Sequence, residues 1–235
     1  MLRCFMAEFD YIRRNYLSLT QEIDSLAERL GYERPTLVSV TKSGSDEELI
    51  ELVRAGASDI GENRPGELKR RGEILSAQGF SPRMHEIGSL QTNKVKLIAD
   101  TVHLVHSLDS ARLARELQKR AEAADRIIPV LIEINSAREE QKGGVLPEAA
   151  EEFAASIKDY PSLKLLGLMT MGPLSEEGEA LRPYFRETKK LFDKLTPYFD
   201  KSSKPILSMG MSDSYRVAIE EGSTLVRVGR ALFIK

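Results

Sequence analysis

A lysine at the end of a short apolar run is the first side chain in this sequence that could do chemistry. Lys42 closes the run Thr36 to Lys42, which is rich in β-branched residues, and is followed by Ser43-Gly44-Ser45. Alternating α/β folds place their chemistry at the carboxyl ends of strands, and a partly desolvated lysine amine can form a Schiff base. The alternative is that Lys42 ends a strand and points into water, as most lysines do.

Two segments near the C-terminus have the residue types of a phosphate site. Ser208 to Ser212 combines hydroxyl donors with a glycine and leads into a helix-like stretch, whose N-terminus would attract an anion. Gly229 and Arg230 offer a second turn, and barrels of alternating strands and helices frequently bind phosphate after their last two strands. Each segment alone could be an ordinary turn, because Gly and Ser occur in many loops.

The elements that position these groups alternate along the chain. Residues 7 to 30 carry apolar positions at helical spacing, with Gly31 as a stop. Eight buried-type strand candidates follow: 36 to 41, 58 to 61, 84 to 88, 102 to 106, 128 to 134, 164 to 170, 205 to 209 and 224 to 228. Helix-like stretches lie between them, for example 46 to 55, 110 to 124, 147 to 158 and 181 to 195. The pattern predicts an α/β fold, a (β/α)8 barrel with an additional N-terminal helix, as one domain over residues 1–235.

Polar residues collect where the predicted strands end. The segments are Lys42, 61 to 63, 85 to 94, Asn135, 169 to 172, 208 to 212 and 227 to 230. In a closed parallel barrel these ends converge on one rim, so the sequence predicts a single site there.

The composition argues against several classes of function. The chain has 235 residues, and 34 Lys and Arg against 36 Asp and Glu give a formal charge of −2, so no strong field favours nucleic acid or an anionic membrane. The cluster Lys69 to Arg71 is expected to be a solvated helix face. One cysteine, Cys4, excludes an intramolecular disulfide and a multi-cysteine metal site. No signal-peptide core or run of about 18 apolar residues occurs, so we expect a cytoplasmic protein without a metal, a membrane or a nucleic-acid partner.

An aldehyde cofactor that carries a phosphate would use both features, and pyridoxal 5'-phosphate (PLP) fits them. The sequence resembles the pyridoxal phosphate homeostasis protein family, which is related to the fold-type III alanine racemase barrels. The resemblance rests on segments spread over nearly the whole chain: 37 to 42, 61 to 64, 85 to 94, 167 to 171, 207 to 212 and 226 to 229. The match is too specific to arise by chance, because three motifs occur in this order: Gly61-Glu62-Asn63, the segment from His85 to Lys94 and the segment from Leu207 to Ser212.

The resemblance implies a role for each matching residue. It makes Lys42 the lysine that holds PLP as a covalent aldimine, places Asn63 and His85 in the cofactor pocket and Met209 near the ring, and assigns the phosphate to Ser212 with the backbone of Gly229 and Arg230. Arg227 would approach the pyridine nitrogen, and because a guanidinium stays protonated it would keep the ring neutral. Without its surrounding motif, His85 would be read as a packed core histidine. His103 and His106 match no motif and are expected to be structural.

Two positions depart from the family pattern. Gly44 stands where the family usually has a second lysine, which removes a candidate for cofactor transfer. Arg230 replaces the usual threonine and removes a hydroxyl from the phosphate site, although its backbone amide remains. We expect phosphate binding to survive. The loop containing Glu139, Lys142 and Gly144 also matches the family, without a role that follows from the residues.

The function implied is a PLP-binding protein that contributes to cofactor homeostasis and has no robust catalytic activity. The alternative is a fold-type III amino-acid racemase, which would need a second base opposite Lys42. The resembled racemases take a tyrosine from an extra β-domain, and this sequence is expected to leave no room for that domain. Tyr215 is the one tyrosine beside a motif, and we expect it to pack or hydrogen-bond at a helix start. A barrel that has lost its cofactor is disfavoured by Lys42, Ser212 and Arg227. A monomer with transient contacts to PLP enzymes is expected.

Overall fold

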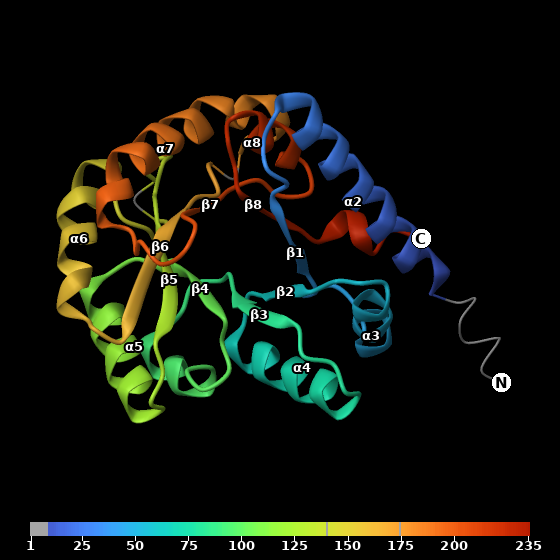
Figure 1. The fold of residues 1–235 in the computed structure, drawn as a ribbon, viewed down its shortest axis with the longest axis horizontal. Helices are drawn as coiled ribbons and strands as arrows, with labels where there is room; N and C mark the ends of the chain where they lie inside the picture. Colours follow the sequence, from blue (N-terminus) through green and yellow to red (C-terminus); the bar gives the residue numbers. More distant parts are fainter. Residues whose placement is uncertain (1–8, 140, 174) are drawn as a thin grey trace.

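Eight parallel strands close into one barrel with helices around it (Figure 1), in a computed structural model that describes residues 9–139, 141–173 and 175–235. The strands are β1 (Thr36–Val40), β2 (Asp59–Glu62), β3 (Arg83–Glu86), β4 (Leu104–Leu108), β5 (Ile128–Glu133), β6 (Leu163–Met169), β7 (Ile206–Ser208) and β8 (Leu225–Val228). They neighbour one another in chain order, and β1 pairs with β8 to close the barrel. The predicted (β/α)8 barrel is confirmed.

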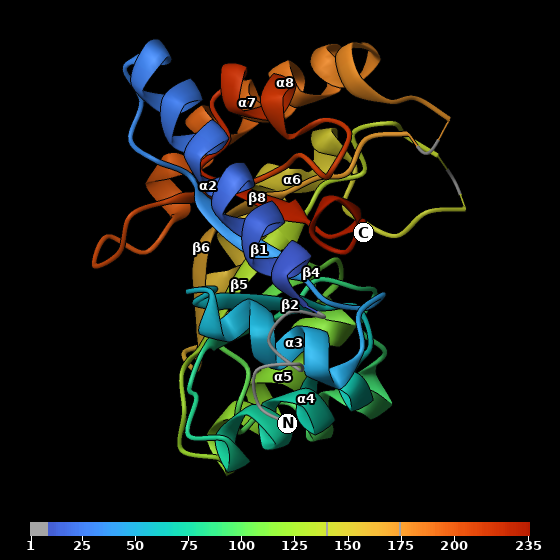
Figure 2. The ribbon, with the colours of Figure 1, turned by 90° about the vertical axis from the view of Figure 1, so that its right-hand side faces the viewer.

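Helices cover the outside of the barrel in the order of the chain (Figures 1 and 2). They are α2 (Asp10–Leu30), α3 (Asp46–Arg54), α4 (Pro65–Ala77), α5 (Ala111–Ala123), α6 (Ala150–Ser156), α7 (Arg182–Leu195) and α8 (Tyr215–Glu220). Short 3₁₀ helices are η1 (Thr92–Leu97), η2 (Pro147–Ala149), η3 (Ile157–Asp159), η4 (Gly178–Leu181), η5 (Thr196–Tyr198) and η6 (Arg230–Leu232). The helix predicted from residue 7 begins at Asp10; residues 7 and 8, like Cys4, lie outside the described part of the chain.

Local sequence explains where several helices begin and end. The Ser45 side chain accepts a hydrogen bond from the backbone of Glu48, and the Glu48 carboxylate accepts one from the backbone of Ser45, which is a capping box at the start of α3. Gly31 ends α2 in the left-handed region at φ 69°, a conformation that glycine adopts without a steric penalty. Helix α2 therefore ends before β1, and the turn that follows β1 ends at the capped start of α3.

Apolar side chains form two separate layers. The larger core lies between the strands and the helices, and the smaller one fills the barrel interior with Val38, Leu104, Leu131, Leu166, Met169 and Leu225. Strand residues alternate between these layers because successive side chains point to opposite faces. Polar residues at interior positions are consequently removed from water and must find partners inside the barrel.

Candidate functional site

Lys42 lies two residues beyond the end of β1, at the carboxyl rim of the barrel. Strand β1 lies between β2 and β8, so Lys42 has the β2 turn with Asn63 on one side and the β8 turn with Gly229 on the other. Its side chain is exposed, and together with Asn63 and five neighbours it lines a hollow of about 320 Å³. The amine is accessible to a ligand from solvent.

A buried arginine fixes the turn that carries Lys42. Arg71 on α4 donates to the carbonyl oxygens of Thr41 (2.5 Å) and Gly44 (2.7 Å), which flank Lys42 and Ser43. It also lies 3.1 Å from a carboxylate oxygen of Glu62 at the end of β2. The expectation of a solvated face for Lys69 to Arg71 is wrong at Arg71, whose side chain is only 6% exposed because it faces the barrel.

The Gly44 departure has a packing reason. A Cβ atom at Gly44 would lie 2.4 Å from the Phe233 ring, which packs over this turn. A lysine here would have to displace that ring. Any transfer role for a second lysine at this position is therefore absent from this chain.

The turns that follow β7 and β8 lie against each other. The Ser212 hydroxyl oxygen accepts a hydrogen bond from the Gly229 backbone amide at 3.2 Å, although the two residues are 17 apart in sequence. The Arg230 side chain is 70% exposed and pairs with Asp213 at 3.0 Å. The structure thus brings Ser212, Gly229 and Arg230 together, and the Arg230 guanidinium is turned towards a carboxylate.

Arg227 is buried at the same end of the barrel. Its guanidinium donates to the Ser208 hydroxyl at 2.6 Å and to the Thr170 carbonyl at 3.0 Å. Burial lowers the pKa of Arg227 to about 10, and the nearby Glu133 carboxylate opposes that shift. The group therefore still carries its charge at neutral pH.

Glu133 is a rim residue that sequence reasoning missed. It is the last residue of β5, and it lines a small pocket with Asn135, Lys142 and Met171. Burial and repulsion from Asp109 raise its pKa to about 7, while Arg227 lowers it. A polar residue ending a strand made otherwise of apolar residues was the signal that could have found it. Its carboxyl group titrates near neutral pH, beside the buried cation.

His85 and Met209 lie deeper than the other predicted site residues. His85 is 2% exposed, and its ring nitrogens face Asp59 (2.9 Å) and His106 (3.0 Å). Met209 is fully buried in the larger apolar core. The structure therefore does not bring either side chain into the hollow beside Lys42, and their predicted contacts with a cofactor stay predictions.

His106 also takes part in the polar interior. It is fully buried on β4, and its second ring nitrogen lies 3.0 Å from the Ser208 hydroxyl. Burial lowers its pKa well below the usual value, with a further contribution from His85 and Arg227. The sequence alone predicts a structural role for His106; the available signal was its place on a predicted buried strand, next to Val105.

Glu86 is another buried carboxyl group, outside the barrel interior. Oε1 accepts from the Gly88 backbone amide at 3.0 Å, and Oε2 has no hydrogen-bond partner among the described residues. Burial raises the pKa of Glu86 to about 8, with a further contribution from Glu62. This carboxyl group is protonated at neutral pH.

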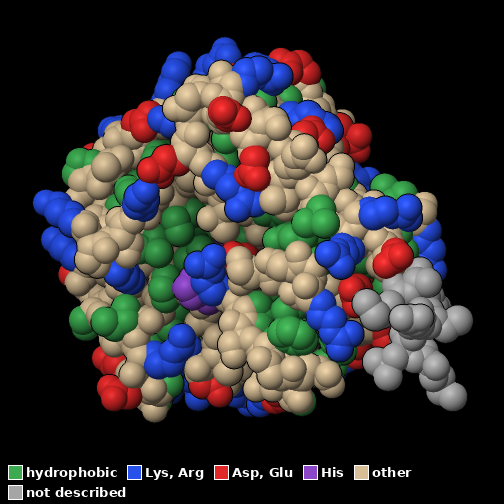
Figure 3. Space-filling view, turned by 45° about the vertical axis from the view of Figure 1, so that its right-hand side comes forward, with side chains coloured by type: hydrophobic (Ala, Val, Ile, Leu, Met, Phe, Trp, Pro, Cys, Tyr) green, Lys and Arg blue, Asp and Glu red, His purple; other side chains and the backbone are tan. Residues whose placement is uncertain are grey.

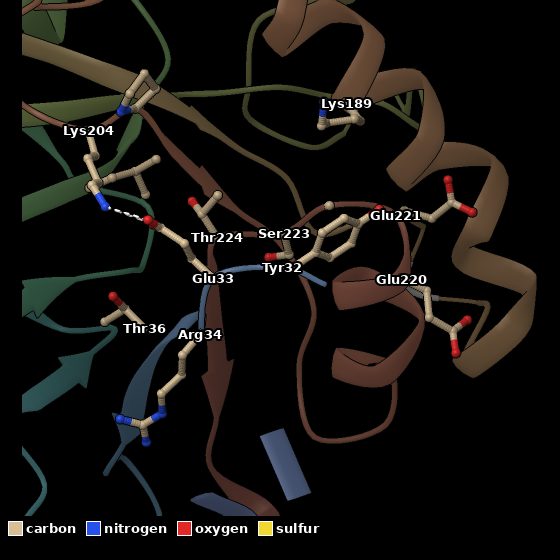
Figure 4. A pocket seen from close by; sticks show the side chains of 13 residues that line it. Tyr32, Glu33, Arg34, Thr36, Lys189, Lys204, Glu220, Glu221, Ser223 and Thr224 are labelled. Carbon is tan, nitrogen blue, oxygen red and sulfur yellow. Dashed lines mark hydrogen bonds and ion pairs between the residues drawn. The ribbon is translucent and has the colours of Figure 1, made fainter. Parts of the chain in front are cut away.

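A larger cavity of about 620 Å³ lies at the opposite end of the barrel (Figure 4). Its charged side chains are already paired, as Lys204 is with Glu33 at 2.8 Å and Lys189 with Asp193 at 2.6 Å. Charges of both signs are interspersed over the face in Figure 3. Among the described residues, no His, Cys, Asp and Glu side chains group as a metal site would need, and no helix has the length and apolarity to cross a membrane.

Comparison with known proteins gives one consistent relationship. A family profile described as the alanine racemase N-terminal domain matches residues 15–235. The pyridoxal phosphate homeostasis protein of Aquifex aeolicus is 44% identical over 197 residues, which cover 84% of this chain and 85% of that protein. The protein of the same name from Helicobacter pylori strain 26695 is 35% identical and covers 92% of this chain and 99% of its own.

Solved structures show the same barrel. PipY of Synechococcus elongatus PCC7942, solved without PLP, superposes with a TM-score of 0.84 at 25% identity and covers 95% of this chain and 100% of its own. The structure of PipY with PLP bound has a TM-score of 0.81 at 24% identity, with the same coverage, and supports the fold.

Proposed function

Because the chain belongs to the pyridoxal phosphate homeostasis protein family, we propose that it binds PLP at the carboxyl rim and contributes to intracellular PLP homeostasis. The observation that carries the proposal is the meeting of three chemically different groups at one rim. Lys42 supplies an accessible amine, the contact between Ser212 and Gly229 supplies a small polar cradle, and Arg227 supplies a buried cation.

These groups fit the parts of PLP. When bound, the cofactor supplies an aldehyde that condenses with a lysine amine, with loss of water. We propose that Lys42 forms this aldimine and that Ser212 and the backbone of Gly229 and Arg230 hold the phosphate. Asn63, beside Lys42 in the hollow, would contact the cofactor directly. His85, in the barrel interior, and Met209, in the larger apolar core, would support the pocket from below the rim.

Arg227 determines the electronic state that we propose for the ring. A buried guanidinium with a pKa of about 10 is a donor only, so it cannot accept a proton from or deliver one readily to the pyridine nitrogen. The ring nitrogen beside it would stay unprotonated. PLP with an unprotonated ring nitrogen is a weaker electron sink, which supports a binding role over a catalytic one.

We propose that the protein has no racemase activity of its own. Tyr215 is 3% exposed, and burial together with a hydrogen bond to Glu22 on α2 raises its pKa to about 12. A proton-accepting role at neutral pH would need the opposite shift. Exchange of the α-proton of D- or L-alanine with solvent deuterium, measured with PLP-loaded protein, tests this point; exchange at enzymatic rates would establish the alternative.

The test of binding is the absorption spectrum of the purified protein with added PLP, followed by borohydride reduction and peptide mass analysis. We expect an aldimine band and a reduced adduct on the peptide with Lys42. Lys42→Ala should lose both, whereas Lys96→Ala, which removes an exposed lysine on η1, should keep both. An unchanged adduct in Lys42→Ala would refute the assignment of the lysine. Absence of any adduct from the unaltered protein would refute PLP binding at the rim.

The remaining expectations stay proposals. We propose a cytoplasmic monomer that contacts PLP enzymes transiently. Sedimentation equilibrium of the loaded and unloaded protein measures the oligomeric state, and a stable dimer at micromolar concentration would contradict the monomer.

A further inference from the structure

A continuous chain of hydrogen bonds crosses the barrel interior from the first residue of β2 to Arg227. Asp59 lies 2.9 Å from Nε2 of His85, and Nδ1 of His85 lies 3.0 Å from Nε2 of His106. Nδ1 of His106 lies 3.0 Å from the Ser208 hydroxyl, which lies 2.6 Å from the Arg227 guanidinium. The chain joins five strands, β2, β3, β4, β7 and β8, and its five residues are at most 3% exposed.

The two ends of the chain determine the direction of every hydrogen bond in it. Arg227 can only donate, so the Ser208 oxygen accepts from it and the Ser208 hydrogen is free to go to Nδ1 of His106. Asp59 is the acceptor at the other end, so His85 donates from Nε2. With both rings neutral, His106 then donates from Nε2 to Nδ1 of His85. Both histidines must hold their proton on Nε2.

The charges of the two ends are consistent with this arrangement. Burial alone would raise the pKa of Asp59, but hydrogen bonds from His85, Arg83 and Ser58 outweigh it and leave the pKa far below its ordinary value. Arg83 donates to both Asp59 oxygens at 2.6 Å and is half-exposed at the outer end of the chain. Burial lowers the pKa of His85 and of His106, so both rings are neutral.

We propose that His106 is a positioning residue for Arg227, acting through Ser208, and that Asp59 and His85 set the tautomer that allows it to do so. A His106 ring with the proton on Nδ1 would donate that hydrogen to the Ser208 oxygen and leave the buried Ser208 hydrogen, beside the guanidinium, without its acceptor. Asp59, at the amino end of β2, thus controls the orientation of a cation at the opposite rim. The consequence for cofactor affinity and spectrum rests on the proposed function, whereas the tautomer does not.

The tautomers are measured directly by ¹⁵N NMR of the histidine-labelled protein without PLP. The chain contains three histidines, and His106→Asn and His103→Phe identify their signals. We expect His85 and His106 as neutral Nε2–H tautomers at pH 7.5. A neutral Nδ1–H tautomer or a protonated ring at either position would overturn the proposal, whether or not the protein binds PLP.

The effect on the site is measured with PLP and three variants. Ser208→Ala removes the hydroxyl that connects His106 with Arg227, and Ser208→Thr keeps a hydroxyl at this position. We expect Ser208→Ala and His106→Asn to weaken PLP binding about tenfold and to shift the aldimine absorption maximum, and Ser208→Thr to restore both. The matched control is His103→Phe, which keeps the ring contact with His85 (5.4 Å between centroids).

The outcomes are distinguishable. If the unaltered protein forms no PLP adduct, the proposed function fails. The tautomers measured by NMR then still show whether the hydrogen-bond chain from Asp59 to Arg227 has the proposed direction. If the unaltered protein binds PLP and folded Ser208→Ala keeps its affinity and spectrum, the positioning role is refuted while PLP binding stands. Thermal unfolding of each variant, compared with Ser208→Thr, separates loss of folding from loss of positioning.

Discussion

Arg71 and Glu62 form a buried ion pair of 3.1 Å between helix α4 and strand β2, beside the turn that carries Lys42. Their side chains are 6% and 1% exposed, and the same guanidinium holds two carbonyl oxygens of that turn. A charge left in such a place without its partner is strongly destabilising. The position of the Lys42 amine therefore depends on a residue of helix α4 that also lines the hollow beside it.

Arg71→Met should destabilise the protein and impair adduct formation together. Removing one partner of a buried pair costs about 3–5 kcal/mol in the free energy of unfolding. Urea unfolding measures this loss, and borohydride trapping at limiting PLP measures the occupancy of Lys42. Arg70→Met is the matched control, because Arg70 is 43% exposed and pairs with Asp46 and Glu67 at the surface. Equal effects of the two substitutions would contradict the role of Arg71.

Ser212→Ala should weaken PLP binding by about tenfold without moving the aldimine absorption maximum, because it removes a phosphate contact and leaves the ring untouched. Equilibrium titration gives the affinity, and the same titration with pyridoxal, which lacks the phosphate, is the internal comparison. Pyridoxal binding should be equal in the two proteins. A loss of the same size for pyridoxal would place Ser212 outside the phosphate site.

Gly88→Ala should disturb the hollow beside Lys42 from behind. A Cβ atom at Gly88 would lie 2.3 Å from the Asn63 carbonyl oxygen, so the turn carrying Asn63 must move. We expect a loss of about 1–3 kcal/mol in unfolding free energy and weaker PLP binding. Gly66→Ala at the start of α4 meets no atom within 4 Å and should leave binding unchanged. Undiminished affinity in folded Gly88→Ala would show that Asn63 does not depend on this contact.

Glu86→Gln should change how stability depends on pH. The pKa of Glu86 in the folded protein, about 8, lies above its ordinary value of 4.5, so the folded state binds a proton that the unfolded state releases. The resulting stabilisation is fully present below pH 4.5 and is lost as the pH rises to 8. The amide does not titrate, so we expect the variant to gain about 2–4 kcal/mol relative to the parent between pH 5 and pH 9.

Guanidinium unfolding across that range measures the Glu86 difference. Glu73→Gln on the exposed face of α4, where the side chain is 67% exposed, is the control. A constant difference between Glu86→Gln and the parent across the range would mean that Glu86 is already ionised at pH 5.

The barrel itself was predictable because its signals are local. The predicted strands at 36 to 41 and 128 to 134 differ from β1 and β5 by one residue at one end, and the strand predicted at 164 to 170 differs from β6 by one residue at each end. Buried parallel strands are continuous apolar runs separated by amphipathic helices, and both patterns are visible within a short window of sequence. The rim position of Lys42, Ser212 and Gly229 was also predictable, because the carboxyl ends of all parallel strands in a closed barrel lie at the same rim.

The polar interior could not be predicted because its pairs are distant in sequence. His106 and Ser208 are 102 residues apart, and Arg71 meets Thr41 across 30. Whether an arginine on a helix faces water or the barrel depends on the rotation of that helix, which a cluster such as Lys69 to Arg71 does not reveal. Burial raises the pKa of Glu133 and of Glu86. Whether a carboxyl group at the end of a strand is buried depends on how the whole barrel closes, and the local sequence does not show it.

The barrel can close only after β8, its last strand in chain order, has been synthesised. Asn15 on α2 donates to the carbonyl oxygens of Leu232 (3.2 Å) and Ile234 (2.8 Å), and β1 has no second neighbour until β8 pairs with it. A chain emerging from the ribosome would expose the edge of β1 while nearly all later elements are made. Lys42 precedes Ser212 and Gly229 by most of the length of the barrel, so a nascent chain would acquire the site only after β8 has been made.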